Sequence, residues 1–142
     1  MSAPIKIALP GFGGRMGQMI FGLVQNESQF VITAATEADG SALIGEDISA
    51  GTVNQNTGVI ISASADILGV DTDVIIDFTR PEATIEHVKV ALETNTAMVI
   101  GTTGLNQSQE KQIAEAAMHI PIIYCANTSI GVTLLSQQVR QI

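Results

Sequence analysis

Cysteine, histidine and basic side chains are scarce in this sequence, and each shortage excludes a class of protein. The single cysteine, Cys125, cannot form an internal disulfide, so we expect a cytoplasmic protein. Only six lysine and arginine residues oppose 14 acidic ones, and the net charge of −8 disfavours a nucleic-acid partner. Neither His87 nor His119 has a second histidine or cysteine at metal-ligand spacing, so no metal site is predicted.

Long apolar runs are also absent. No stretch approaches the roughly 20 apolar residues of a membrane span, so we expect no membrane partner. Pro10 and the glycines after it interrupt the apolar N-terminal segment before it reaches the length of a signal peptide. Hydrophobic residues nevertheless make up 46% of the 142 residues and charged ones only 14%, which indicates a folded domain with a core.

Glycine is abundant, and it is concentrated after the first apolar segment. Residues 5–9 predict a strand, and apolar residues at helical spacing predict a helix over about residues 15–25. Between them, Gly11, Gly14 and Gly17 form the pattern G-x-x-G-x-x-G. A strand, a glycine turn and a helix N-terminus together are typical of a dinucleotide pyrophosphate site. The alternative for this motif alone is a plain strand-to-helix turn.

An acidic residue at a characteristic distance strengthens this interpretation. Residues 30–35 predict the next strand, and Glu37 follows it, about 20 residues after Gly17, where such domains bind the ribose 2′-hydroxyl. A carboxylate there accepts a hydrogen bond from that hydroxyl and repels a 2′-phosphate. We therefore predict that NADH is preferred over NADPH, and the alternative is that Glu37 is an ordinary loop acid.

Strand and helix patterns alternate along the rest of the chain. Residues 38–58 predict a long loop with room for one short helix. Further strands are predicted at 59–62, 74–78, 97–100 and 121–124, and helices at 81–92, capped by Thr79 or Arg80, and from a Ser108 cap to about Met118. Repeated βαβ units predict an α/β, Rossmann-like, doubly wound and mostly parallel sheet, whose ligand binds at the carboxyl ends of the strands.

Few residues suggest catalysis. We predict that His87 and His119 have no catalytic or metal-binding role, and that Cys125 is a small packing residue and not a nucleophile. Asp77 at the end of a buried strand is predicted to orient the loop after it. No pair of carboxylates has evident acid–base roles. The sequence therefore predicts cofactor binding and no catalytic residue in this chain.

Four segments together resemble the nucleotide-binding half of the 4-hydroxy-tetrahydrodipicolinate reductase family, also called dihydrodipicolinate reductases. They are the glycine run with R-M-G at 15–17, D-F-T-R-P-E at 77–82, V-I-G-T-T-G at 99–104 and A-N-T-S-I-G-V at 126–132. A generic Rossmann protein would match the first segment alone. The resemblance implies hydride transfer from NADH or NADPH to a cyclic hydroxy-dicarboxylate in lysine and diaminopimelate biosynthesis.

The resemblance also implies which residues bind the cofactor. The pyrophosphate would be held by Gly11, Phe12, Gly13, Gly14, Arg15 and Met16, and the adenosine ribose by Glu37. Phe78, Thr79 and Arg80 would flank the cofactor, and its nicotinamide end would be lined by Gly101, Thr102, Thr103, Cys125, Ala126, Asn127 and Thr128. Ala38 stands where many NADPH-accepting members carry a basic residue.

The family's catalytic His-His-x-x-Lys segment does not occur in these 142 residues. We therefore expect a nucleotide-binding domain at 1–128 and only the start of a substrate domain at 129–142, so that cofactor binds without turnover. The apolar stripe Val132, Leu135, Val139 and Ile142 stops without a cap, which favours the first part of a longer protein. The small-molecule substrate and the family's homotetramer would belong to the full length. The alternatives are a stand-alone nucleotide- or CoA-binding module and a fragment that binds nothing.

Overall fold

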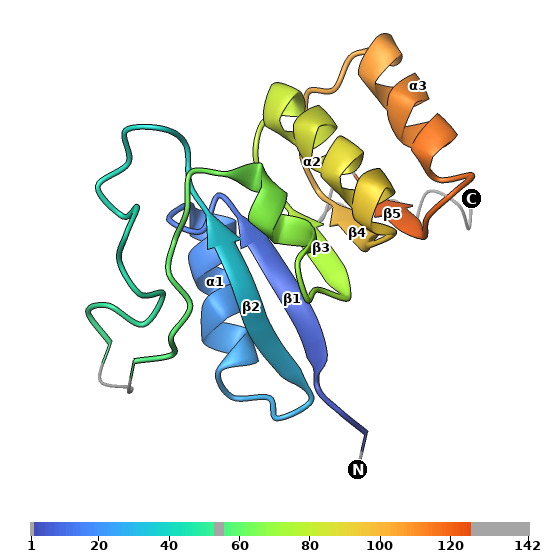
Figure 1. Cartoon of the computed structure of the whole chain (residues 1–142). Coiled ribbons are helices and arrows are strands. Elements are labelled where there is room, and N and C mark those ends of the chain that lie inside the picture. Colours follow the sequence, from blue (N-terminus) through green and yellow to red (C-terminus); the bar gives the residue numbers. More distant parts are fainter. Residues whose placement is uncertain (1, 53–55, 126–142) are drawn as a thin grey trace, which may run out of the picture.

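The structure is a computed structural model in which residues 2–52 and 56–125 are described. Strands and helices alternate along this part of the chain (Figure 1). In order they are β1 (Ile5–Pro10), α1 (Arg15–Val24), β2 (Phe30–Thr36), the 3₁₀-helix η1 (Ala65–Gly69), β3 (Val74–Asp77), α2 (Pro81–Thr94), β4 (Ala97–Ile100), α3 (Gln107–Ala116) and β5 (Ile122–Tyr124).

The strands form one parallel sheet in the order β2-β1-β3-β4-β5. The chain winds outward from β1 to β2, then crosses back to the other side of β1 and continues through β3, β4 and β5. This reversal confirms the predicted Rossmann-like, doubly wound fold. The carboxyl ends of β1 and β3 flank the switch point, which is where open α/β sheets bind their ligands.

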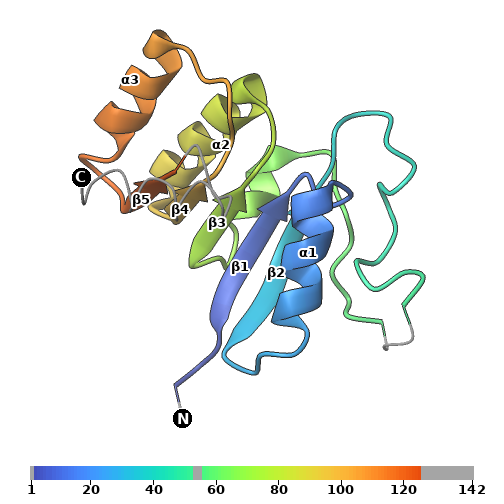
Figure 2. The same cartoon turned by 180° about the vertical axis from the view of Figure 1, so that it is seen from behind.

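Helices cover both faces of the sheet (Figures 1 and 2). α1 packs on one face, and η1, α2 and α3 pack on the other. The alternating side chains of β1 divide accordingly, because Ile7 and Leu9 belong to a core with Phe21 of α1, while Ala8 belongs to a core with Val88 of α2. Burial from both sides explains the nearly continuous apolar runs of these strands.

Most element boundaries agree with the sequence prediction to within one or two residues, but the cap of α3 was predicted wrongly. Asn106, not Ser108, is the N-cap. Its side-chain oxygen accepts from the Gln109 N–H, and the Gln109 side chain accepts from the Asn106 N–H, each at 2.9 Å. This reciprocal pair satisfies two N–H groups at the helix start, which explains why the helix begins there.

The long loop between β2 and η1 is held together by Asp47. Its carboxylate accepts hydrogen bonds from Ser49, Thr57 and Gly58 at 2.6–3.2 Å. Desolvation alone would raise the pKa of Asp47, but the hydrogen bonds from Ser49 and Thr57 lower it below its usual value. The strand predicted at 59–62 is wrong, since only isolated bridges form there, and the described part of 38–58 contains no helix. None of the helices in residues 2–52 and 56–125 has the length and apolar character needed to cross a membrane.

Candidate functional site

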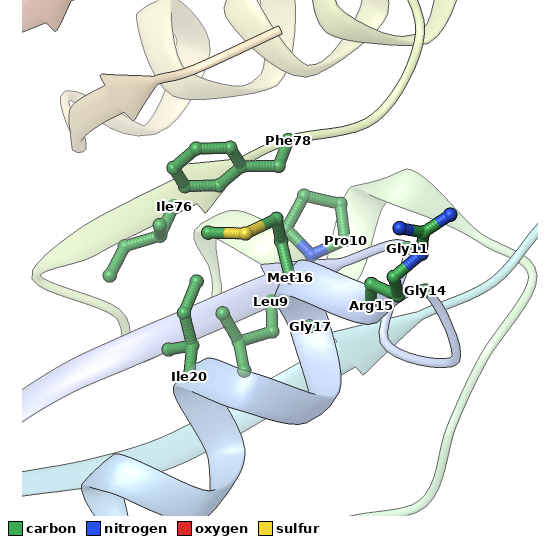
Figure 3. A pocket seen from close by; sticks show the side chains of 10 residues that line it. All are labelled: Leu9, Pro10, Gly11, Gly14, Arg15, Met16, Gly17, Ile20, Ile76 and Phe78. Atoms are coloured by element: carbon green, nitrogen blue, oxygen red, sulfur yellow. The ribbon is translucent and has the colours of Figure 1, made fainter. Parts of the chain in front are cut away.

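A cavity opens at the switch point because β1 and β3 pair over only part of their length. The ladder joins Ile7 to Val74 and Ala8 to Ile75, and the strands separate beyond it. The resulting space of about 200 Å³ is lined by both strand ends, the glycine turn and the start of α1 (Figure 3). Figure 3 shows the ring of Phe78, which follows β3, above the Met16 side chain of α1.

Two glycines of the turn are required by its geometry. Gly11 has φ +66°, and a Cβ there would lie 2.8 Å from the Thr79 side chain. A Cβ on Gly17 would lie 2.5 Å from the carbonyl oxygen of Phe12 and 2.7 Å from that of Gly11. The start of α1 therefore sits directly on the backbone of the turn, and the missing side chain of Gly17 permits this close packing.

The N–H groups that are available to a ligand lie at the start of α1. Three N–H groups are already used inside the protein: Phe12 donates to Thr36 at 3.1 Å, Gly13 to Glu37 at 2.5 Å, and Gly14 to Gly11 at 3.0 Å. No side chain of the described residues caps α1 at Gly14, so within this part of the chain the N–H groups of Arg15 and Met16 have no intrahelical or side-chain acceptor. These donors and the positive end of the helix dipole suit a phosphate.

Phe12 does not line the cavity at the switch point, although the resemblance groups it with the pyrophosphate-binding residues. Its side chain is buried and packs edge-on against Phe21, with ring centroids 5.3 Å apart. Phe12 therefore shapes the turn from the core.

A second cavity of about 470 Å³ continues from the turn toward the end of β2, and we call it the β2-side groove. Its wall brings Glu37 and Asp39 together with Thr79, Arg80 and His87. Glu37 is fixed there, because its carboxylate accepts from the N–H groups of Gly13 at 2.5 Å and Ala38 at 3.2 Å. Arg15 lines the smaller cavity instead.

A buried carboxylate joins the loop after β3 to α2. One oxygen of Asp77 lies 2.7 Å from Nδ1 of His87, and the other accepts from the N–H and hydroxyl of Thr79 at 2.8 and 2.6 Å. Burial alone would raise the pKa of Asp77, but His87 and Thr79 together lower it. The prediction that Asp77 orients the following loop is confirmed. His87 is buried, and its pairing with Asp77 was missed, although a carboxylate ending an apolar strand requires a partner.

The described members of the predicted nicotinamide end follow β4 and β5 at the same sheet edge but line neither cavity; they are Gly101, Thr102, Thr103 and Cys125. The Phe78 ring occupies the space that a Cβ on Gly101 would need. Thr102 is buried and shares a 2.7 Å hydrogen bond with Thr84, so its hydroxyl faces the Asp77 network. Cys125 is exposed, so the prediction that it is a packing residue is wrong. Ala126, Asn127 and Thr128 lie outside the described residues. Within the described ranges, no three His, Cys, Asp or Glu side chains are grouped as metal ligands.

We predict that the pairing of Asp77 makes the protein sensitive to acid. Because its pKa is lower in the folded state than the ordinary 3.8, its stabilisation is present above about pH 3.8 and is lost as the pH falls below that value. Asp77→Asn should lower the free energy of unfolding by about 1–3 kcal/mol at neutral pH and remove this part of the acid dependence. Urea unfolding at several pH values measures both effects, and Asp66→Asn on the exposed side of η1 is the control. An acid dependence that is unchanged in Asp77→Asn would contradict the assignment.

Comparison with known proteins gives a consistent result. The sequence profile of the family described as "Dihydrodipicolinate reductase, N-terminus" matches residues 5–128. The 4-hydroxy-tetrahydrodipicolinate reductase of Acinetobacter baumannii is 44% identical over 135 residues, which are 94% of this chain and 49% of that protein. The protein of the same name from Paraburkholderia phymatum is 38% identical over 130 residues, with 92% and 49% covered.

A solved structure extends the likeness to three dimensions. It is a dipicolinate-bound dihydrodipicolinate reductase from Paenisporosarcina sp., and it matches with a TM-score of 0.73 at 28% identity, over 95% of this chain and 52% of that one. The chain spans about half the length of the curated relatives it matches. By its profile match and its relatives, the chain belongs to the dihydrodipicolinate reductase family and corresponds to the N-terminal part of its members.

Proposed function

We propose that this chain is the NADH-binding part of a 4-hydroxy-tetrahydrodipicolinate reductase. The observation that carries the proposal is the switch-point site, where the uncapped start of α1 and the carboxylate of Glu37 are joined through Gly13. A dinucleotide has a pyrophosphate and a ribose, and each finds a partner of suitable chemistry here, since the start of α1 offers N–H donors and Glu37 offers a carboxylate acceptor. Family membership makes a nicotinamide cofactor the expected ligand.

The chain's residues would bind and orient the cofactor. The N–H groups of Arg15 and Met16 would donate to the pyrophosphate, with Gly11, Gly13 and Gly14 providing the close approach of the backbone. Glu37 would accept from the adenosine ribose, and Thr79 and Arg80 would form the opposite wall of the β2-side groove. When bound, the nicotinamide supplies a hydride. Its end of the cofactor would be flanked by Phe78 and lined by Gly101, Thr102, Thr103, Cys125, Ala126, Asn127 and Thr128.

The rest of the reaction would require residues outside this sequence. We propose that residues 1–128 form the nucleotide-binding domain, and that 129–142 connect it to a substrate domain. That domain would bind 4-hydroxy-tetrahydrodipicolinate and complete a homotetrameric, cytoplasmic enzyme of lysine and diaminopimelate biosynthesis. The 142 residues alone should therefore bind NADH and reduce no substrate. Turnover of NADH by the purified chain would contradict this.

A pair of substitutions tests the pyrophosphate site. Arg15→Pro removes the first N–H of α1, at a position where helices tolerate proline and after Gly14, whose extended ψ of 167° suits a following proline. Arg15→Ala removes the same side chain but keeps the N–H. We expect Arg15→Pro to bind NADH about tenfold to 100-fold more weakly than Arg15→Ala, because a hydrogen bond to a charged group contributes about 1.5–3 kcal/mol.

Calorimetric titration with NADH, and with CoA as the competing ligand, measures these affinities. Circular dichroism should show the same helix content in both variants. Equal NADH affinity of the two variants would show that the first N–H group of α1 does not contribute to NADH binding. Binding of CoA in place of NADH would favour a stand-alone CoA-binding module, and binding of neither ligand would favour a structural fragment.

A further inference from the structure

His87 lies between the buried carboxylate of Asp77 and the β2-side groove. Its Nδ1 atom is 2.7 Å from Asp77, and its side chain is only 8% exposed. The same residue forms part of the groove wall. One imidazole therefore touches both the network that fixes the loop after β3 and the space where we place the adenosine end of the cofactor.

The second ring nitrogen, Nε2, takes no part in the contact with Asp77. No hydrogen-bond partner of Nε2 occurs among the described residues. Yet in this part of the chain no buried side-chain nitrogen or oxygen lacks a partner. Nε2 is thus in contact with solvent, and the groove is the surface that His87 lines. A ligand in the groove would meet Nε2 while Nδ1 stays with Asp77.

The charges around the imidazole are mostly negative. Asp77 faces it from β3, Glu37 and Asp39 line the groove from the end of β2, and Glu86 lines it from α2. Arg80 at the start of α2 is the one cation among the described lining residues. The 3₁₀-helix η1 contributes only the uncharged Ala65 to the wall, and the charged residue next to it in sequence is Asp66. An anionic nucleotide adds negative charge to this set, so it should favour the protonated ring, whose Nε2–H can donate into the groove.

We propose that His87 is a positioning residue that couples cofactor binding to proton uptake, holding Asp77 through Nδ1 and donating toward the bound nucleotide through Nε2. The inference rests on the proposed function. The protonated imidazole would hold two partners at once, the loop of residues 77–79 and the ligand. The neutral form with its proton on Nδ1 would still hold the loop, but its Nε2 could only accept and could not donate to an anionic ligand.

The coupling predicts that NADH binds more tightly as the pH falls through the range where histidines titrate, about pH 5 to pH 8. We expect a difference of about three- to tenfold in Kd across that range, since a displacement of one pH unit in a linked titration corresponds to tenfold in affinity. NADH is the appropriate probe because, unlike NADPH, it lacks a 2′-phosphate that titrates near neutral pH.

The experiment compares the 142-residue chain with His87→Asn and His119→Asn. An asparagine at position 87 offers an N–H to Asp77 but does not titrate. His119, the other histidine, follows α3 and lines a separate cavity between α2 and α3, so its variant is the matched control. Calorimetric titration with NADH at several pH values, in buffers of different ionisation enthalpy, gives both Kd and the number of protons taken up.

Uptake of a fraction of a proton by the wild type and by His119→Asn, with pH-independent binding by His87→Asn, would support the proposal. A structural role alone would weaken NADH binding equally at every pH, without proton uptake. Should His87→Asn fail to fold, the two histidine Cε1–H resonances of the wild type provide the test, because NADH should move the titration of one of them to higher pH.

Other results overturn the inference in distinguishable ways. Proton uptake that persists in His87→Asn, or NADH binding that is independent of pH in the wild type, overturns the role of His87 and leaves the proposed function intact. An absence of NADH binding at every pH overturns the proposed function and this inference with it.

Discussion

Gly17→Ala should abolish NADH binding and destabilise the fold, whereas Gly22→Ala in the same helix should stabilise it. The added methyl at position 17 would lie 2.5 Å from the Phe12 carbonyl oxygen and 2.7 Å from that of Gly11. Both are backbone atoms of the glycine turn, so neither can turn aside as a flexible side chain would. The start of α1 must move away from the turn, and the N–H groups of Arg15 and Met16 move with it.

The sizes of the two effects follow from the two environments. Overpacking in a fixed site costs about 1–3 kcal/mol, so Gly17→Ala should unfold at a lower urea concentration. A Cβ on Gly22 would meet nothing within 4 Å, and Gly22 lies inside α1, where alanine is favoured over glycine by about 0.5–1 kcal/mol. Urea unfolding and NADH titration of both variants measure the contrast. Wild-type NADH affinity in Gly17→Ala would show that the position of α1 on the turn does not matter for binding.

Local patterns were sufficient to predict most of the framework. Apolar periodicity locates the strands and helices, and the need of a tight turn for glycine is enough to identify Gly11 and Gly17 from the sequence. Parallel strands bring their carboxyl ends to one edge, so the order of elements also placed Glu37, Phe78 and Gly101 together. These conclusions depend on backbone geometry, which neighbouring residues largely determine.

The interactions that were missed depend on contacts between distant segments. The sequence does not show that Glu37 binds the Gly13 N–H, 24 residues earlier, or that His87 pairs with Asp77 across the start of α2. Phe12 lies within the glycine motif, yet packing against Phe21 places its side chain in the core. The position of Arg80 is a further case, because Arg80 shares a cavity with Glu37, whereas Arg15 of the glycine motif lines the smaller cavity.

The location of Arg80 bears on the choice between NADH and NADPH, for which we predict a preference for NADH. Two backbone N–H groups hold the Glu37 carboxylate in place, so it cannot swing away from a 2′-phosphate. Its remaining lone pairs can still accept from a 2′-hydroxyl. Like charges about 4 Å apart repel by about 4 kcal/mol at an effective dielectric constant near 20. Solvent in the open groove and the guanidinium of Arg80 both reduce this figure.

We therefore expect the wild type to bind NADH about tenfold more tightly than NADPH, which corresponds to about 1.4 kcal/mol. Ala38→Arg adds a guanidinium next to Glu37, at an exposed position of the groove, and should remove most of that preference by strengthening NADPH binding. Arg80→Gln is the complementary variant, because loss of its charge should weaken NADPH more than NADH. Calorimetric titration of both cofactors against the three proteins measures all of these ratios. If the wild type binds NADPH as tightly as NADH but Arg80→Gln prefers NADH, the charge of Arg80 outweighs that of Glu37. If the wild type and Arg80→Gln each bind the two cofactors equally, Glu37 does not face the ribose. A fixed carboxylate at that place must discriminate between a hydroxyl and a phosphate.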